Sequence, residues 1–174
     1  DLAVLFCVKV EDEKLGKGSI VVKNDLKEDW GVSEEEIFDA ALKAMRTEAP
    51  ISFIHIFDVL SSLIPEEKKK DITGDLSDRE TPMYVVTNPD KYYGATAILC
   101  SEELGDFADE LGEDMYILPS SIHELILLPA GCAKPDYLKE LVMSVNRTQL
   151  EEETVLSDSV YYFDRIERKV SRVA

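Results

Sequence analysis

The chain has 174 residues, enough for one well-buried core, and its 45% hydrophobic and 32% charged residues are typical of a globular protein. It holds 36 acidic against 19 basic residues, a formal net charge of -17. That charge repels phosphate backbones and anionic lipids, so we expect neither nucleic acid nor a membrane as a partner. The one locally basic stretch indicates a solvated chain end, and it contains Arg165, Arg168, Lys169 and Arg172.

The cysteines and the missing motifs limit the chemistry further. Cys7, Cys100 and Cys132 are odd in number and show no CxxC spacing, which indicates neither a disulfide framework nor a zinc site. No phosphate-binding glycine loop, hydrolase elbow, HExxH or EF-hand motif is present, so we expect no cofactor and no metal. With no apolar run near the roughly 20 residues of a membrane helix and no signal segment, the sequence predicts a cytoplasmic protein.

The first part of the chain predicts a hairpin followed by two helices. Residues 2–10 are almost continuously apolar, as in a strand covered on both faces, and residues 19–23 can pair back onto them. Ser33 can cap a helix while Glu36 returns the hydrogen bond. Apolar residues at helical spacing predict a second helix over 52–64.

The rest of the chain alternates between strand and helix patterns. Turn residues Asn88-Pro89-Asp90 follow the first strand, Ser101 is expected to cap a helix, and Gly112 to end it. Pro135 is expected to open the last helix at its first turn. In chain order we expect a strand at 83–87, a strand at 95–100, a helix at 101–112, strands at 115–118 and 125–128, a helix from 135, and a strand at 160–163.

Hairpins and helices follow one another without regular βαβ units, which predicts an α+β fold. We expect a mainly antiparallel sheet of hairpins with three to four amphipathic helices packed on it. One domain over 1–174 is the simplest organisation. A charged connector over 65–81 divides it into possible sub-units 1–64 and 82–174. The chain opens without Met on an apolar run, which indicates the back part of a longer polypeptide with an upstream region as a partner.

A polar segment between the strands at 115–118 and 125–128 holds the candidate site. In an extended segment side chains alternate between faces, so Ser121 and His123 share a face whereas His123 and Glu124 point apart. A Ser121–His123 pair is therefore geometrically possible. Ser121, His123 and Glu124 are the candidate catalytic residues of a hydrolase or metal-assisted enzyme, although the sequence identifies no oxyanion donors.

The same segment has a structural interpretation. Ser120 and Ser121 would satisfy turn backbone groups while His123 donates to a carbonyl and locks the hairpin. The other histidine, His55, falls on the polar face of the helix predicted over 52–64, where it is expected to be exposed. Because no catalytic set is complete, a non-enzymatic interaction or small-ligand-binding module is the leading hypothesis. Its expected ligand-binding residues are Asn88, Tyr93, Ser120, Ser121 and His123.

Short clusters of residues spread along the chain are specific enough to compare with known families. They are Asp1-Leu2-Ala3-Val4, Trp30-Gly31-Val32-Ser33, Pro82-Met83-Tyr84-Val85, Tyr93-Gly94-Ala95, Ile117-Leu118-Pro119-Ser120-Ser121-Ile122-His123-Glu124, Val145-Asn146-Arg147-Thr148 and Val155-Leu156-Ser157-Asp158-Ser159-Val160-Tyr161. In these clusters the chain resembles, nearly end to end, a family of uncharacterised bacterial proteins, the domain of unknown function 5688 family. The resemblance implies a further N-terminal region, and it brings no established activity, cofactor or catalytic residue.

Overall fold

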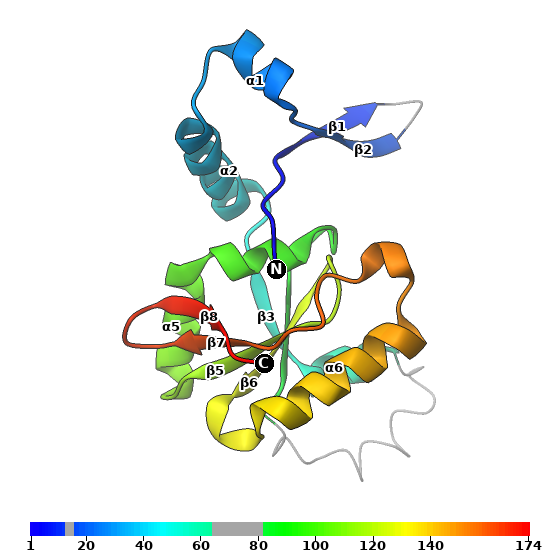
Figure 1. Ribbon diagram of the computed structural model, residues 1–174, viewed down its shortest axis with the longest axis vertical. Helices are drawn as coiled ribbons and strands as arrows, with labels where there is room; N and C mark the ends of the chain where they lie inside the picture. The colour runs from blue at the N-terminus through cyan, green and yellow to red at the C-terminus, as the bar shows by residue number, and fades with distance from the viewer. Residues whose placement is uncertain (13–15, 64–81) are drawn as a thin grey trace. The chain divides into compact units, whose positions relative to one another are not determined.

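The computed structural model describes residues 1–12, 16–63 and 82–174, which form two compact units (Figure 1). Unit 1 is Asp1–Ala49 and unit 2 is Pro50–Ala174. This boundary falls before the segment 52–64 and not after it, because residues of that segment pair into the sheet of unit 2. The predicted connector 65–81 lies outside the described residues.

Unit 1 consists of a hairpin and two helices. The hairpin pairs β1 (Cys7–Asp12) with β2 (Gly16–Val21) in antiparallel register. A hairpin was predicted here, but its strands were expected over 2–10 and 19–23. A short helix α1 (Asn24–Trp30) ends at Gly31, whose φ of 65° is the left-handed conformation that favours glycine. The longer helix is α2 (Glu34–Glu48).

The predicted capping box of α2 is confirmed. The Ser33 hydroxyl accepts a hydrogen bond from the backbone N–H of Glu36 at 3.2 Å, and the Glu36 carboxylate accepts one from the Ser33 N–H at 2.9 Å. The expectation that the first strand is covered on both faces is wrong, because Val8 and Val10 are each 40% exposed. Two strands alone do not enclose an apolar face, so the apolar run does not by itself bury the hairpin.

Unit 2 is built on one six-stranded sheet in which every neighbouring pair is antiparallel. This arrangement confirms the predicted α+β fold with a mainly antiparallel sheet. The strand order is β3-β4-β6-β5-β7-β8. The strands are β3 (Ser52–His55), β4 (Tyr84–Thr87), β5 (Met115–Pro119), β6 (Leu125–Pro129), β7 (Tyr161–Asp164) and β8 (Lys169–Arg172).

Helices cover both faces of this sheet, and Figure 1 shows α6 (Pro135–Gln149) crossing one of them. The 3-10 helix η1 (Gly94–Leu99) and α5 (Ser101–Leu111) pack on the opposite face. Successive residues of the central strands alternate between the two cores: Ile117 belongs to the η1 and α5 side, Leu118 to the α6 side. β5 and β6 are buried on both faces, which explains why their sequences are continuous apolar runs.

Two predicted elements are wrong. The segment 52–64 is not one helix, because β3 precedes α3 (Ile56–Leu63). Phe53 pairs with Val86 of β4, and its ring stacks on that of Phe107 of α5 with the two ring centroids 4.2 Å apart. Tertiary packing therefore overrides the helical spacing of the sequence. His55 is consequently a strand residue, half-buried, whose Nδ1 accepts the Phe57 N–H at 3.2 Å.

The segment 95–100 is a 3-10 helix and not a strand. Three of the buried residues in this stretch, Gly94, Ala97 and Cys100, recur every three positions, which is the 3-10 period, and Ala95 is buried as well. Ser101 is the first residue of α5 rather than its cap, which is Cys100. The remaining strands and helices predicted after residue 82 are confirmed to within one or two residues.

The basic chain end forms a hairpin, in which Lys169 and Arg172 are exposed, as expected of a solvated end. β8, which the sequence did not predict, pairs with β7. Two arginines beyond the tip of β7 clamp this hairpin to α5: Arg165 pairs with Asp109 at 3.1 Å, and Arg168 pairs with Asp106 at 2.9 Å and Asp109 at 3.1 Å. Among the described residues no helix combines the length and apolar character that crossing a membrane requires.

Candidate functional site

Loops from distant parts of unit 2 meet at one end of the sheet. β4 and β5 are each antiparallel to β6, so they run in the same direction, and their carboxyl ends lie at the same end of the sheet. The loop after β4 holds Asn88 and Tyr93, and the turn after β5 holds Ser120–Glu124. The structure therefore brings together the two groups of predicted ligand-binding residues, which are about 30 positions apart in sequence.

The loop after β4 is held in an unusual conformation. Lys91 and Tyr93 have φ values of 50° and 53°, in the left-handed region that residues with a side chain rarely adopt. The Asn88 side chain braces this loop, because its Nδ2 donates to the Tyr92 carbonyl at 2.9 Å and its Oδ1 accepts the Tyr92 N–H at 3.3 Å. Left-handed residues with a side chain persist only where their surroundings fix them, and they are concentrated at ligand sites.

Gly94 allows the loop and the turn to touch. A Cβ at this position would meet the backbone oxygen of His123 and the hydroxyl oxygen of Thr87, each at 2.4 Å, so no larger residue fits without a shift of the backbone. The buried Thr87 hydroxyl donates to the same His123 oxygen at 2.9 Å. The sheet end is therefore closed by direct backbone packing.

His123 faces the loop through its ring. Its Nδ1 accepts the backbone N–H of Tyr93 at 3.2 Å. Nδ1 therefore carries no proton, and the N–H of the neutral ring is on Nε2. The imidazole also stacks on Tyr92 and Tyr93, with ring centroids 5.5 and 6.0 Å away and interplanar angles of 27° and 26°. We call Tyr92, Tyr93 and His123 the ring cluster.

The turn itself is held by its serines. The buried Ser121 hydroxyl oxygen accepts the backbone N–H of His123 at 3.0 Å, and the Ser121 N–H donates to the Glu124 carbonyl at 3.1 Å. Ser120 and Glu124 form a long side-chain hydrogen bond of 3.4 Å. Ser121 therefore contacts the backbone of His123, and the imidazole bonds to Tyr93. The serines hold the turn. The His123 ring accepts a hydrogen bond from a backbone N–H, where a donation to a carbonyl was expected.

Sequence reasoning missed three contributors to this end of the sheet, namely Thr87, Tyr92 and Gly94. Tyr92 and Gly94 flank the predicted Tyr93, and a glycine between two tyrosines and an apolar run is a signal of close backbone approach. No pattern in the sequence indicates that Thr87 bonds to a residue 36 positions away.

A buried amide at the same end joins the last helix to the sheet. Asn146 of α6 donates through Nδ2 to the Ser157 carbonyl at 3.1 Å and to Asp158 Oδ1 at 2.8 Å. The Tyr161 hydroxyl, on the first residue of β7, donates to the Ser157 hydroxyl oxygen at 3.2 Å. Four of the clusters that resemble the family thus meet here, those around Tyr93, Ser121, Asn146 and Ser157.

The clear pKa perturbations of unit 2 lie at the opposite end, where β5 begins. The Tyr162 hydroxyl donates to Asp114 at 2.5 Å, and the Arg165 N–H donates to it at 2.9 Å. These two bonds, the Tyr162 bond foremost, lower the pKa of the Asp114 carboxyl, and the same carboxylate raises the pKa of Tyr162 to about 12. Both groups fasten the β7–β8 hairpin, so these shifts have a structural explanation.

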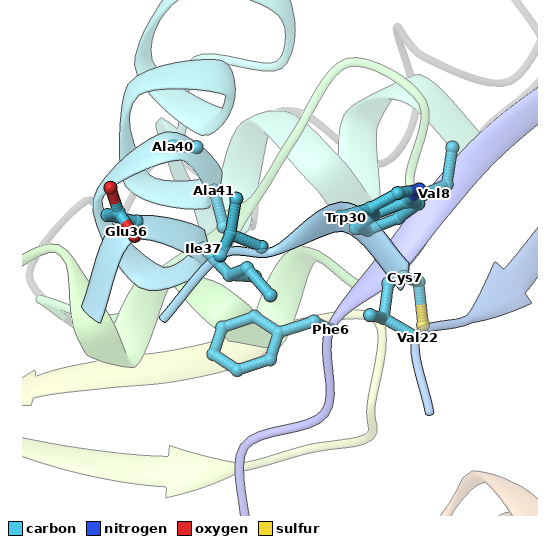
Figure 2. A pocket seen from close by; sticks show the side chains of 10 residues that line it. Phe6, Cys7, Val8, Val22, Trp30, Glu36, Ile37, Ala40 and Ala41 are labelled. Carbon is cyan, nitrogen blue, oxygen red and sulfur yellow. The ribbon is translucent and has the colours of Figure 1, made fainter. Parts of the chain in front are cut away.

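Unit 1 carries a separate apolar groove of about 310 Å³. Figure 2 shows Phe6, Trp30 and Ile37 among its lining residues. Its one carboxylate, Glu36, is bound to Ser33 in the capping box, and this bond lowers the pKa of Glu36. The groove thus offers apolar contact without a polar group positioned for a ligand, and we do not count it as the site. In the described ranges no three His, Cys, Asp or Glu side chains converge in a way that could hold a metal ion.

The fold and the cluster define an acidic α+β protein with loops gathered at one end of an antiparallel sheet. Residues 1–165 match the model of a family of unknown function, DUF5688, so the chain belongs to that family and the predicted resemblance is confirmed. No curated protein and no solved structure matches the chain significantly.

Proposed function

We propose that the chain is a non-enzymatic binding module whose ligand, a protein or a small molecule, contacts the ring cluster. The observation that supports this most is the pair of left-handed residues, Lys91 and Tyr93, which flank Tyr92, a residue that remains 39% exposed. The Asn88 side chain and the close backbone approach at Gly94 hold that loop in place. A backbone conformation this unfavourable is maintained where the displayed side chains have a use.

The geometry of His123 supports binding over hydrolysis. In a serine hydrolase the histidine donates from Nδ1 to a carboxylate and accepts the serine proton at Nε2. Here Nδ1 accepts an N–H, so Nε2 holds the proton and acts as a donor. The Ser121 hydroxyl oxygen is engaged by the His123 backbone rather than by its ring. These roles suit a residue of a binding site better than the base of a hydrolase.

The formal net charge of -17 argues against nucleic acid and against an anionic membrane surface as the partner, because it would repel both. The exposed thiols of Cys7 and Cys132 support a cytoplasmic location, where a reducing environment keeps thiols free.

The experiment is site-specific photo-crosslinking in cells. A benzophenone amino acid replaces Tyr92 in one variant and Tyr137, an equally aromatic but 63% exposed residue of α6, in a matched control. We expect a discrete crosslinked species from position 92 that is absent from position 137. A small-molecule ligand would appear as a defined mass increase of the chain. Identical products from both positions, or none from position 92 under several growth conditions, would contradict the proposed function.

A further inference from the structure

The ring cluster offers aromatic faces within a small region. The centroids of Tyr92 and Tyr93 are 4.1 Å apart, and both lie within 6.0 Å of the His123 ring. Tyr92 is 39% exposed, so the cluster reaches the surface. The face of a tyrosine ring carries partial negative charge and attracts a cation placed within about 6 Å of its centre. Such contact is short-ranged and depends on the rings being fixed, as these are.

Three loop segments that meet at this end of the sheet carry more acidic than basic residues. Segments 88–96, 120–124 and 151–159 meet there, and the Ile122 N–H donates to the Thr154 carbonyl at 2.9 Å to join the last two. Acidic residues outnumber basic ones in these segments. The resulting negative field attracts cations and repels phosphate and carboxylate ligands. The carboxylates are Asp90, Glu124, Glu151, Glu152, Glu153 and Asp158, and the one basic residue in these segments is Lys91.

The two features act at different ranges. The carboxylates attract a cation from solution, and the rings then contact it directly. Neither feature alone selects a ligand, because acidic loops are common in so acidic a chain and exposed rings bind many groups. Their coincidence at one strained loop is what specifies the charge of the ligand.

We propose that the ring cluster binds a cationic group, an ammonium or a guanidinium, carried either by a small amine or by a Lys or Arg side chain of another polypeptide. This inference rests on the proposed function and names the ligand class of the same site.

The test uses the full chain and two matched pairs of probes, followed by NMR of the tyrosine rings. Choline is compared with its uncharged isostere 3,3-dimethyl-1-butanol, and a lysine flanked by blocked termini is compared with norleucine in the same form. We expect saturable shifts of Tyr92 and Tyr93 with the charged member of a pair and none with the neutral one. Tighter binding of choline would indicate a small amine, and tighter binding of the lysine probe a polypeptide side chain.

Substitutions test whether the Tyr92 ring contacts the cation. Tyr92→Leu removes the ring and should weaken choline binding about three- to tenfold, whereas Tyr92→Phe keeps the ring and should change it less than about twofold. Tyr137→Leu, on α6, should have no effect. Because Tyr92→Phe removes only a hydroxyl, it remains a valid comparison even if Tyr92→Leu disturbs the loop.

The outcomes separate this inference from the proposed function. Equal binding of the neutral isostere would overturn the cationic class and leave a binding cluster. If no cation binds although position 92 crosslinks specifically, the cationic class is also overturned. A failed crosslink would instead overturn the proposed function itself.

Discussion

The two units of the chain are built from the same kinds of element but bury them very differently. In unit 2 the sheet is covered on both faces, and Phe163, Leu104 and Met115 have no exposed surface. Among the described residues of unit 1 the most buried hydrophobic residue is Ala49, at 9% exposure. An apolar stripe on a strand or helix therefore creates a core only where a second layer packs against it.

The consequence is that the units depend on different interactions. Unit 2 has a tightly packed core, whereas most of the described side chains of unit 1 are exposed or half-buried. The single tryptophan, Trp30, lies in unit 1, so its fluorescence reports on that unit, while circular dichroism is dominated by the larger unit 2. The two signals make the comparison measurable by urea unfolding.

The largest effect is expected in the core of unit 2. Phe163→Ala removes a fully buried ring from β7 and should lower the free energy of unfolding by about 3–5 kcal/mol. The circular dichroism transition should move to lower urea while the Trp30 transition stays in place. Val10→Ala, in the exposed face of β1, is the control and should cost well under about 1 kcal/mol. Equal costs for both variants would show that the two units are not differently packed.

An intermediate effect is expected at the helix cap of unit 1. Ser33→Ala removes the hydroxyl that accepts the Glu36 N–H in the capping box and should destabilise α2 by about 1 kcal/mol. Here the Trp30 fluorescence transition should shift, and the circular dichroism transition of unit 2 should not. Ser33→Asp, which keeps a capping oxygen, is the matched control. A shift of both transitions together would mean that the units unfold as one.

The smallest effect is expected at the Asp114–Tyr162 bond, which fastens unit 2 outside its core. The pKa of Asp114 is lowered from 3.8, so its contribution to stability is present above pH 3.8 and lost as the pH falls through the folded value. The pKa of Tyr162 is raised from 10.0 to about 12, so its contribution is present below pH 10.0 and lost between 10.0 and 12.

Asp114→Asn should therefore return the pKa of Tyr162 toward 10.0, as followed by the NMR signal of its ring carbon. Asp109→Asn breaks ion pairs to Arg165 and Arg168 without touching Tyr162, and it should leave the pKa of Tyr162 at about 12. If Tyr162 ionises at the same pH in the wild type and in Asp114→Asn, the hydrogen bond does not cause the shift.

Much of the fold follows from local patterns in the sequence. The Ser33–Glu36 box, the Gly112 helix end and the apolar runs of β5 and β6 each act over a few residues, so the sequence displays them directly. The segment 52–64 could not be predicted in the same way. Its spacing is helical, but pairing of Phe53 with Val86 decides its first four residues.

The candidate site shows the same division. Asn88, Tyr93 and the serines with His123 were identified from the sequence as polar or turn residues beside buried strands. Their association was not, because it depends on β4 and β5 both being antiparallel to β6, which places their ends together. The role of His123 likewise depends on the N–H of Tyr93, 30 residues away.

The acidic α+β class, the bounds of several elements after residue 82 and the family of the chain could be predicted from the sequence, because charge, periodicity and caps are properties of short stretches. The tertiary structure decided which apolar faces became a core, as in unit 2 but not in unit 1. It also decided that the histidine turns its Nδ1 to a backbone N–H and stacks on two tyrosines. Those outcomes depend on residues far apart in the chain, which only the folded sheet brings into contact.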